Sequence, residues 1–359
     1  MYLDFFGLRD FPFRLTPDTE FLYMSSAHAR AKAYMDYSVW NREGFVVITG
    51  EIGCGKTMLV KKLLTELDEE NVLVGKIFQT QLNDVEFLQS VLVEFGLNPF
   101  NAKKVELIDM LNTFLIENYQ KLKQIVLIVD DAHNLNIKAL EEIRMLSGLE
   151  TQKEKILHVI LVGQPQLNEM LESPELEQLM QRVRLRFHLR PLSLEDTSAY
   201  IAHRMNVAGA ARTDIFTPET VPVIHKYTGG VPRLINTLCD TALTVAFADE
   251  IHTITIAALK EAIDELQWQS FDRRVLAKRA KGNAKSDRAA ESSSQERALT
   301  HIDTRLNQMD ILAPALALIV DRMANIERLL TGIAGHLQND KTTPSVQVPA
   351  TRKTSGKEH

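Results

Sequence analysis

Short apolar runs alternate with amphipathic stretches between Phe45 and about Arg190. The runs are FVVITG, NVLVGKIFQ, QIVLIVDDA, ILHVILVG and VRLRFHL. Most of them are continuously apolar, as expected of strands that are buried on both faces of a parallel sheet. The stretches between them predict helices over 56–66, 85–95, 105–121 and 137–149. Strands that alternate with helices predict an α/β fold, in which helices cover both faces of a parallel sheet.

The pattern changes after Pro191. Residues 192–268 show helical periodicity, with turn signals at 208–214 and 228–230. Thr217, Pro218 and Glu219 predict a helix start, because they supply an N-cap, a proline at the first helical position and an acid in the first turn. This part is predicted to be a small all-helical lid domain.

The C-terminal part is polar at first and then weakly periodic. Residues 271–299 lack the large apolar side chains of a core and predict a linker. Apolar residues then recur in heptad-like steps from Ile302 to Leu337, interrupted by Pro314. A coiled-coil or docking helix and a helix without a fixed partner both fit this pattern. The predicted boundaries are an N-terminal arm and helix (1–44), the α/β core (45–191), the lid (192–268), a charged linker (269–300), the heptad-like helix (301–338) and a disordered tail (339–359).

Composition describes an ordinary soluble protein. The 359 residues are 45% hydrophobic and 25% charged, with a formal net charge of -6. This balance argues against a wholly basic nucleic-acid binder, although a local basic surface stays open. Cys54 and Cys239 are far apart and fit a reducing cytosol. The N-terminus does not resemble a signal peptide, and the longest apolar run, 311–320, is about half of what a membrane helix needs. The expected location is the cytoplasm.

The stretch GEIGCGKTM at 50–58 fits the phosphate-binding pattern G-x-x-x-x-G-K-[ST], between a predicted strand and a predicted helix. Its glycines let the backbone turn its N–H groups toward a phosphate, and the helix N-terminus adds favourable partial charge. Lys56 would reach the β and γ phosphates of ATP, and Thr57 would offer its hydroxyl to Mg²⁺. The predicted nucleotide-binding residues are Gly50, Glu51, Ile52, Gly53, Cys54, Gly55, Lys56, Thr57 and Met58. Cys54 could be a redox-active thiol or a small filler.

Several polar residues could complete this site. Asp130, at the end of QIVLIVDD, predicts a magnesium-facing acid, and Asp131 predicts the acid that polarises water. Gln164 follows the strand ILHVILVG, where its amide could orient the attacking water. Arg233 opens a predicted lid helix and could fold back onto the γ-phosphate. Each of these could instead be an ordinary strand-end or turn residue.

Three arginines at alternate positions, Arg182, Arg184 and Arg186, would share one face of a strand. One of them could reach the nucleotide of a neighbouring subunit as an arginine finger. The alternative is a solvated or acid-paired basic face.

Taken together, these motifs resemble AAA+ ATPases of the ExeA-like family, also called general secretion pathway protein A. The resemblance runs through the first 268 residues and rests on the opening MYLDFFGLRDFPFRLTPDTEFLYMSSAH, EGFVVITGEIGCGKT, VDDAHNL, LVGQP, LMQRVRLRFHLRPLS and TGGVPRLINTLCDTAL. It implies a bacterial cytoplasmic ATPase whose nucleotide lies between core and lid. By motif position, Gln164 matches sensor 1, Arg182 the arginine finger and Arg233 sensor 2. The family's aromatic opening corresponds to Phe5, Phe6, Pro12 and Phe13, for which we expect packing rather than contact with the base.

Two departures from the family pattern affect the expected activity. Many relatives have Asp-Glu where this chain has Asp130-Asp131, and the shorter acid predicts slow turnover or a switch-like protein. Longer secretion members continue into a membrane span and a peptidoglycan-binding region, neither of which occurs in this chain.

Three hypotheses for the function follow. The first is a homo-oligomeric ATP switch that serves a bacterial envelope export machine (a secretion, pilus, or exopolysaccharide and PEP-CTERM system), in the cytoplasm or peripheral at the inner membrane. The second is a DNA-binding AAA+ ATPase of a transposition system, with phosphate contacts from Arg182, Arg184, Arg186 and the basic stretch 273–288. The third is a scaffold that binds ATP and barely hydrolyses it.

Overall fold

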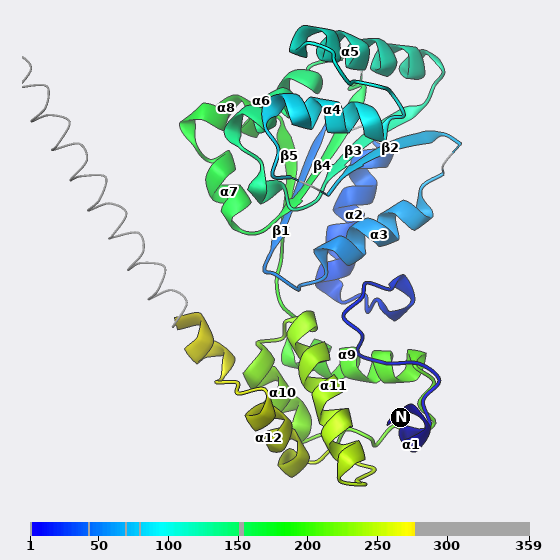
Figure 1. The fold of residues 1–359 in the computed structure, drawn as a ribbon, viewed down its shortest axis with the longest axis vertical. Coiled ribbons are helices and arrows are strands. Elements are labelled where there is room, and N and C mark those ends of the chain that lie inside the picture. The colour runs from blue at the N-terminus through cyan, green and yellow to red at the C-terminus, as the bar shows by residue number, and fades with distance from the viewer. Residues whose placement is uncertain (1, 42–43, 69, 79, 151–153, 277–359) are drawn as a thin grey trace, which may run out of the picture. The chain divides into compact units, whose positions relative to one another are not determined.

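Five parallel strands form one sheet, in the spatial order β2-β3-β4-β1-β5 (Figure 1). The computed structural model describes residues 2–276, apart from 42–43, 69, 79 and 151–153. The strands are β1 (Phe45–Gly50), β2 (Val72–Ile77), β3 (Gln124–Val129), β4 (Leu157–Gly163) and β5 (Val183–Leu189). Every residue of β1 and β4 is buried, which explains their nearly continuous apolar runs. The predicted α/β fold with a parallel sheet is confirmed.

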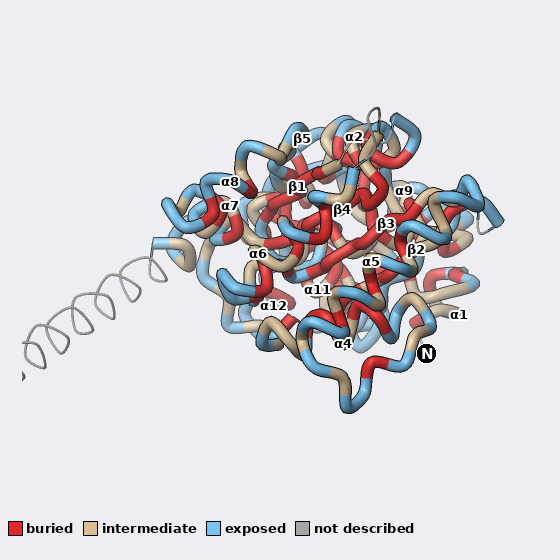
Figure 2. Tube along the Cα trace, turned by 90° about the horizontal axis from the view of Figure 1, so that it is seen from above, coloured by how far each residue is buried: buried red, intermediate tan, exposed pale blue. Residues whose placement is uncertain are grey.

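Helices cover both faces of this sheet. Ile48 and its neighbours on one face pack against α2 and α3, whereas Val47 and its neighbours on the other face pack against α4, α5, α6, α7 and α8. Successive residues of a strand point to opposite faces, so the pleat itself divides the core into two clusters. Figure 2 shows the buried stretches that run along β1, β3 and β4. The helices are α2 (Ser26–Trp40), α3 (Lys56–Glu66), α4 (Asp84–Glu94), α5 (Lys104–Gln120), α6 (Ile137–Leu146), α7 (Gln166–Leu171) and α8 (Glu177–Met180).

Helix α6 ends earlier than predicted. The prediction continued the helix to residue 149, whereas the structure ends it at Leu146. The backbone N–H of Gly148 then donates to the Met145 carbonyl at 2.9 Å and closes a turn. Arg182 donates a hydrogen bond to Ser147 Oγ at 3.0 Å. The early end therefore comes from a tertiary contact that helical periodicity does not encode.

The lid contains α9 (Leu194–Val207), α10 (Thr220–Thr228), α11 (Pro232–Ala248) and α12 (Ile256–Glu265), around a hydrophobic cluster of its own. The predicted start of α10 is wrong. The backbone N–H and the hydroxyl of Thr220 both donate to the carbonyl of Thr217, at 2.9 and 2.6 Å. These bonds tighten residues 217–219 into a turn, and the Thr217 hydroxyl has no partner among the described atoms.

The N-terminal arm packs on the lid. Phe6 and Phe13 are buried in the lid cluster, and Phe5 stacks on His252 with ring centroids 3.9 Å apart. The arm is fixed by α1 (Tyr2–Phe6) and by hydrogen bonds from Arg204 to the carbonyls of Pro12 and Arg14. The aromatic opening packs against apolar side chains as expected, but the surface that it covers belongs to the lid and not to the α/β core.

The structure continues helical backbone into the predicted linker, through residues 271–276. Phe271 covers Gly229, since a Cβ on that glycine would lie 2.3 Å from the Phe271 ring. Arg274 donates to the Tyr227 carbonyl and lies 4.4 Å above the Trp268 ring. The heptad-like helix, the tail and residues 277–288 of the basic stretch lie outside the described residues. Within the described part of the chain, no helix has the length and apolarity of a membrane span.

Candidate functional site

The loop between β1 and α3 has the backbone of a phosphate cradle. Gly53 and Gly55 have φ angles of +83° and +95°, in the left-handed region that side chains disfavour. Gly50 is required for a different reason, because a Cβ there would lie 2.6 Å from the Leu189 carbonyl oxygen on β5. Two glycines therefore supply the turn, and one supplies close packing against the neighbouring strand.

Lys56 and Thr57 begin α3 directly after this loop. The Lys56 ammonium donates to the carbonyls of Gly50 and Glu51, at 2.8 and 2.9 Å. Burial lowers the pKa of Lys56, while neighbouring acids, among them Asp130, act in the opposite direction. The amine is thus a buried cation held over the phosphate loop.

Asp130 follows β3 and meets Thr57. The Thr57 hydroxyl donates to Asp130 Oδ2 at 2.7 Å, and the backbone N–H of Asp131 donates to Oδ1 at 2.9 Å. Asp130 is 3% exposed, and this burial raises the pKa of its carboxyl. A hydroxyl and a carboxylate in contact are a hard oxygen pair of the kind that Mg²⁺ prefers, so these two predicted ligands fit the ion.

Asp131 has a strained backbone and an accessible carboxylate. Its φ is +52°, a region that costs a residue with a side chain about 1–2 kcal/mol. The Thr80 hydroxyl donates to its carbonyl at 3.0 Å, which helps to hold this conformation. The side chain is 58% exposed. The acid is therefore oriented by its backbone and left open at its carboxylate.

A buried histidine on α2, His28, contacts the backbone of the phosphate loop. The His28 ring on α2 lies 2.7 Å from the Ser25 hydroxyl through Nδ1 and 3.0 Å from the Cys54 carbonyl through Nε2. A carbonyl only accepts, so Nε2 carries the hydrogen, and Nδ1 accepts from Ser25. Desolvation lowers the pKa of His28, which keeps the ring neutral. Sequence reasoning missed this residue, because a single histidine on a helix carries no periodic signal.

Cys54 faces the core under the loop. It is fully buried, and burial raises the pKa of its thiol to about 11. A thiol that stays protonated at neutral pH is a poor nucleophile, so the structure supports the small-filler interpretation over the redox one.

Arg233, in the first turn of α11, connects the lid to the phosphate loop through a backbone hydrogen bond. Its backbone N–H donates to the Gly53 carbonyl at 3.2 Å, and a Cβ on Gly53 would lie 2.6 Å from the Arg233 Cβ. The missing side chain at Gly53 therefore admits the first turn of α11. The predicted sensor residue and the phosphate loop are in direct contact.

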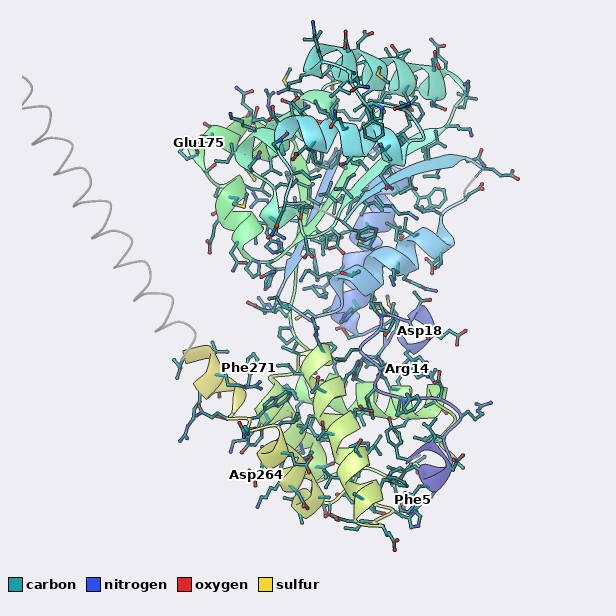
Figure 3. All side chains as sticks on the ribbon, viewed as in Figure 1. Phe5, Arg14, Asp18, Glu175, Asp264 and Phe271 are labelled. Atoms are coloured by element: carbon teal, nitrogen blue, oxygen red, sulfur yellow. The ribbon has the colours of Figure 1, made fainter. Side chains whose placement is uncertain are left out.

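A cleft of about 470 Å³ opens between these elements. Its walls come from the arm, the loop, the strand ends and the lid. They contain Arg14, Leu15, Thr16, Pro17, Asp18, Ile52, Gly53, Gly55, Lys56, Thr57, Met58, Asp131, Gln164, Tyr200, Arg204, Pro232, Arg233 and Asn236. Figure 3 labels Arg14 and Asp18, on the segment of the arm that passes between lid and core. Of the predicted loop residues, Gly50, Glu51 and Cys54 are not part of this wall.

Apart from Arg233, the lid and arm residues that line the cleft were not predicted. Tyr200 donates to Asn236 at 2.7 Å, Arg204 donates to the Tyr200 hydroxyl at 3.1 Å, and Asn236 donates to the Arg14 carbonyl at 3.3 Å. These bonds tie the arm to α9 and α11. In the sequence, these residues are visible only as polar positions on helix faces that are otherwise apolar.

The three arginines lie away from the cleft. Arg182 directly precedes β5, and its guanidinium donates to the Arg144 carbonyl at 2.6 Å and to Ser147 Oγ at 3.0 Å. Arg184 and Arg186 are exposed on β5, and Arg186 lies 3.5 Å from the Glu172 carboxylate. The structure thus brings together Lys56, Thr57, Asp130, Asp131, Gln164 and Arg233, and leaves the arginine-finger candidates elsewhere on the same subunit.

Residues 40–171 match a family described as an AAA domain. The chain is 40% identical over 279 residues, or 75% of its length, to General secretion pathway protein A of Aeromonas hydrophila, and it spans 50% of that relative.

Solved structures share the fold at low identity. The crystal structure of Cdc6p from Pyrobaculum aerophilum has a TM-score of 0.56 and 15% identity, covering 69% of this chain and 70% of the other. The ORC2 protein of Aeropyrum pernix, in ADPNP-ADP complexes, has a TM-score of 0.50 and 17% identity, covering 67% and 66%. Drosophila ORC bound to DNA has a TM-score of 0.51 and 16% identity, covering 67% and 60%.

The predicted P-loop core and the predicted resemblance are both confirmed by these matches. Residues 40–171 therefore form an AAA domain, and over three quarters of its length the chain is similar to General secretion pathway protein A.

Proposed function

We propose that this chain binds and hydrolyses ATP, and that it acts as an oligomeric switch in a bacterial envelope export machine. The observation that carries the proposal is the contact between Thr57 and Asp130 at the head of the glycine loop. This pair lies beside a cleft whose wall also contains Asp131, Gln164 and Arg233. Phosphate-binding, metal-binding and water-orienting groups therefore converge on one site.

The residues for binding ATP and Mg²⁺ come from two adjacent elements. The loop N–H groups and the start of α3 would hold the phosphates, with Lys56 as the neutralising cation. Thr57 and Asp130 would hold Mg²⁺, which neutralises charge on phosphate oxygens when it is bound. The base would lie against the arm and lid residues of the cleft, among them Arg14 and Asn236.

Asp131 and Gln164 are the residues that we propose for hydrolysis, because both lie on the wall of the cleft. The exposed Asp131 carboxylate can accept a hydrogen bond from the attacking water, and the Gln164 amide opens onto the same cleft. The aspartate is one methylene shorter than glutamate, so its water would lie farther from the phosphate. Slow turnover is the expected consequence.

A neighbouring subunit would complete the site. Arg182, Arg184 and Arg186 lie outside the cleft of their own chain, so whichever of them acts as an arginine finger would do so at the cleft of a second copy. We propose Arg182 for this role on the basis of its motif position. The active form is then a homo-oligomer.

The export partner is proposed from the relative's name, General secretion pathway protein A. The chain spans about half the length of that relative, so its partner and its cellular machine are part of the proposal. We place it in the cytoplasm or at the inner membrane surface, where it would meet an export-machine protein. The DNA-binding alternative depends mainly on the basic stretch 273–288, most of which lies outside the described residues.

Phosphate release measured against protein concentration tests the proposal. Lys56→Ala should abolish hydrolysis and weaken nucleotide binding. Lys62→Ala is the matched control, because Lys62 is on the same helix and pairs with Glu66 at the surface, 3.0 Å away. Unchanged turnover in Lys56→Ala would reject the site.

A second measurement tests whether the site is shared between subunits. Activity per subunit should fall on dilution, and Arg182→Ala should remove the concentration dependence together with most of the activity. Activity that stays constant on dilution, and that Arg182→Ala does not change, would reject the oligomeric mechanism while leaving the ATPase itself in place.

A further inference from the structure

His133 contacts Gln164 with both of its ring nitrogens. Its Nε2 atom lies 2.6 Å from the position assigned to the Gln164 amide nitrogen, and its Nδ1 atom accepts from the Gln164 backbone N–H at 3.4 Å. The His133 side chain is only 11% exposed, so water has little access to the ring. The imidazole and the amide form one hydrogen-bonded unit at the edge of the cleft.

The chemistry of the two groups determines which end of the amide faces the ring. The backbone N–H is a fixed donor, so Nδ1 has to offer its lone pair, and the ring hydrogen is then on Nε2. A protonated Nε2 needs an acceptor, and the amide oxygen is the acceptor that Gln164 has. The two ends of an amide fill the same space and are assigned by such a network, so the oxygen belongs on the ring.

We propose that His133 is a positioning residue that holds the Gln164 oxygen and thereby directs its NH₂ group into the cleft. This inference rests on the proposed ATPase function. An NH₂ group donates and does not accept, so Gln164 would bind the γ-phosphate oxygens or a lone pair of the attacking water. Proton acceptance then remains with Asp131, whose Oδ1 lies 3.9 Å from His133 Nδ1, beyond hydrogen-bond distance.

The backbone around the pair makes this arrangement specific. His133 lies in the short helix η2 (Ala132–Asn134), and Gln164 follows β4. A Cβ on Gly163 would lie 2.9 Å from Leu167 Cδ2 and 3.3 Å from the backbone nitrogen of His133. The glycine of LVGQP therefore lets the VDDAHNL segment approach closely enough for both ring contacts.

The first test reads the ring directly, without nucleotide. Nitrogen-15 NMR of the histidine rings in the full chain at pH 8, with His133→Phe used to assign the signal, should show His133 with hydrogen on Nε2 alone. A ring with hydrogen on Nδ1 would overturn the inference, even in an active ATPase. An Nε2-protonated ring in a chain that hydrolyses no ATP would instead reject the proposed function.

The second test is a double-mutant cycle on turnover. His133→Phe keeps a ring and should lower kcat by about 10- to 100-fold, a loss typical of a misplaced group, with little change in the affinity for a fluorescent ATP analogue. His133→Gln, which can return an N–H donor, should recover part of the loss. Adding His133→Phe to Gln164→Leu should cost nothing further, because Gln164 is the group through which His133 acts. A double variant whose loss in kcat is the product of the two single losses would overturn the inference. His252→Phe on the lid is the control for replacing a histidine.

Discussion

Replacing His28 with leucine should destabilise the protein and loosen its phosphate loop. Leucine fills a similar volume at this 3% exposed position, so the change removes hydrogen bonds and leaves packing nearly intact. The Cys54 carbonyl loses its donor at 3.0 Å, and the Ser25 hydroxyl loses its acceptor at 2.7 Å. A buried polar group without a partner costs about 1–3 kcal/mol. Ser25 still accepts from the His28 backbone N–H at 3.3 Å, so we expect a total loss of about 2 kcal/mol.

Thermal unfolding followed by circular dichroism measures this loss. A loss of about 2 kcal/mol corresponds to a fall in Tm of about 4–8 °C for a domain of this size. The matched control is His203→Leu, because the buried His203 Nε2 has no hydrogen-bond partner among the described residues. That control should leave Tm unchanged or raise it. A His28→Leu protein that melts with the wild type, or a His203→Leu protein that loses as much, would refute the reasoning.

Three further predictions concern pH, the glycine loop and the second acid. Burial lowers the pKa of His28, so as the pH falls the unfolded chain binds a proton at this residue at a higher pH, near 6.5, than the folded chain does. The wild type should therefore lose stability below pH 6.5, by up to about 1.4 kcal/mol per pH unit, and its Tm advantage over His28→Leu in thermal melts should shrink. Gly53→Ala should weaken nucleotide binding in a fluorescence titration more than Gly7→Ala does, because Gly7 also has a positive φ, of +65°, but has open space around it; equal effects would contradict the role of the Arg233 contact. Asp131→Glu should raise the rate of phosphate release, and an unchanged or lower rate would show that the length of this acid does not limit turnover.

Local patterns predicted the sheet and the phosphate loop because their physical causes are local. A strand buried on both faces is apolar throughout, and a phosphate cradle needs glycines at fixed spacing, so β1 and the loop at 50–58 are visible in the sequence. His28 contacts the Cys54 carbonyl 26 residues further along the chain, and Tyr200 contacts Asn236 36 residues further along. Their roles depend on tertiary contacts, and periodicity cannot show them.

Element boundaries were mispredicted for two reasons: tertiary contacts at the end of α6 and in residues 271–276, and a local turn at the start of α10. Thr217 and Pro218 satisfy the local rules for a helix start, but both donors of Thr220 turn back to the Thr217 carbonyl and delay the helix. The prediction assigns residues 271–276 to the linker together with the polar stretch that follows them, although Phe271, Val275 and Leu276 are apolar. Phe271 covers Gly229 and Arg274 stacks on Trp268, and these contacts are sufficient to order them on the lid.

The contacts of Arg182 bear on how a shared site would form. Its two hydrogen bonds to Arg144 and Ser147 close the end of α6 in the subunit described here, and each is worth about 0.5–1.5 kcal/mol. An arginine finger at this position therefore has to give up about 1–3 kcal/mol before it reaches a neighbour. Arg186 instead leaves an exposed ion pair with Glu172, worth about 0–1 kcal/mol, and a contact with the Met180 sulfur. If Arg182 is the finger, assembly has to supply that difference, and its release couples the end of α6 to the neighbouring nucleotide. Arg182→Ala would then lower stability as well as activity. The dependence of activity on protein concentration, rather than activity at one concentration, is the measurement that separates the two effects.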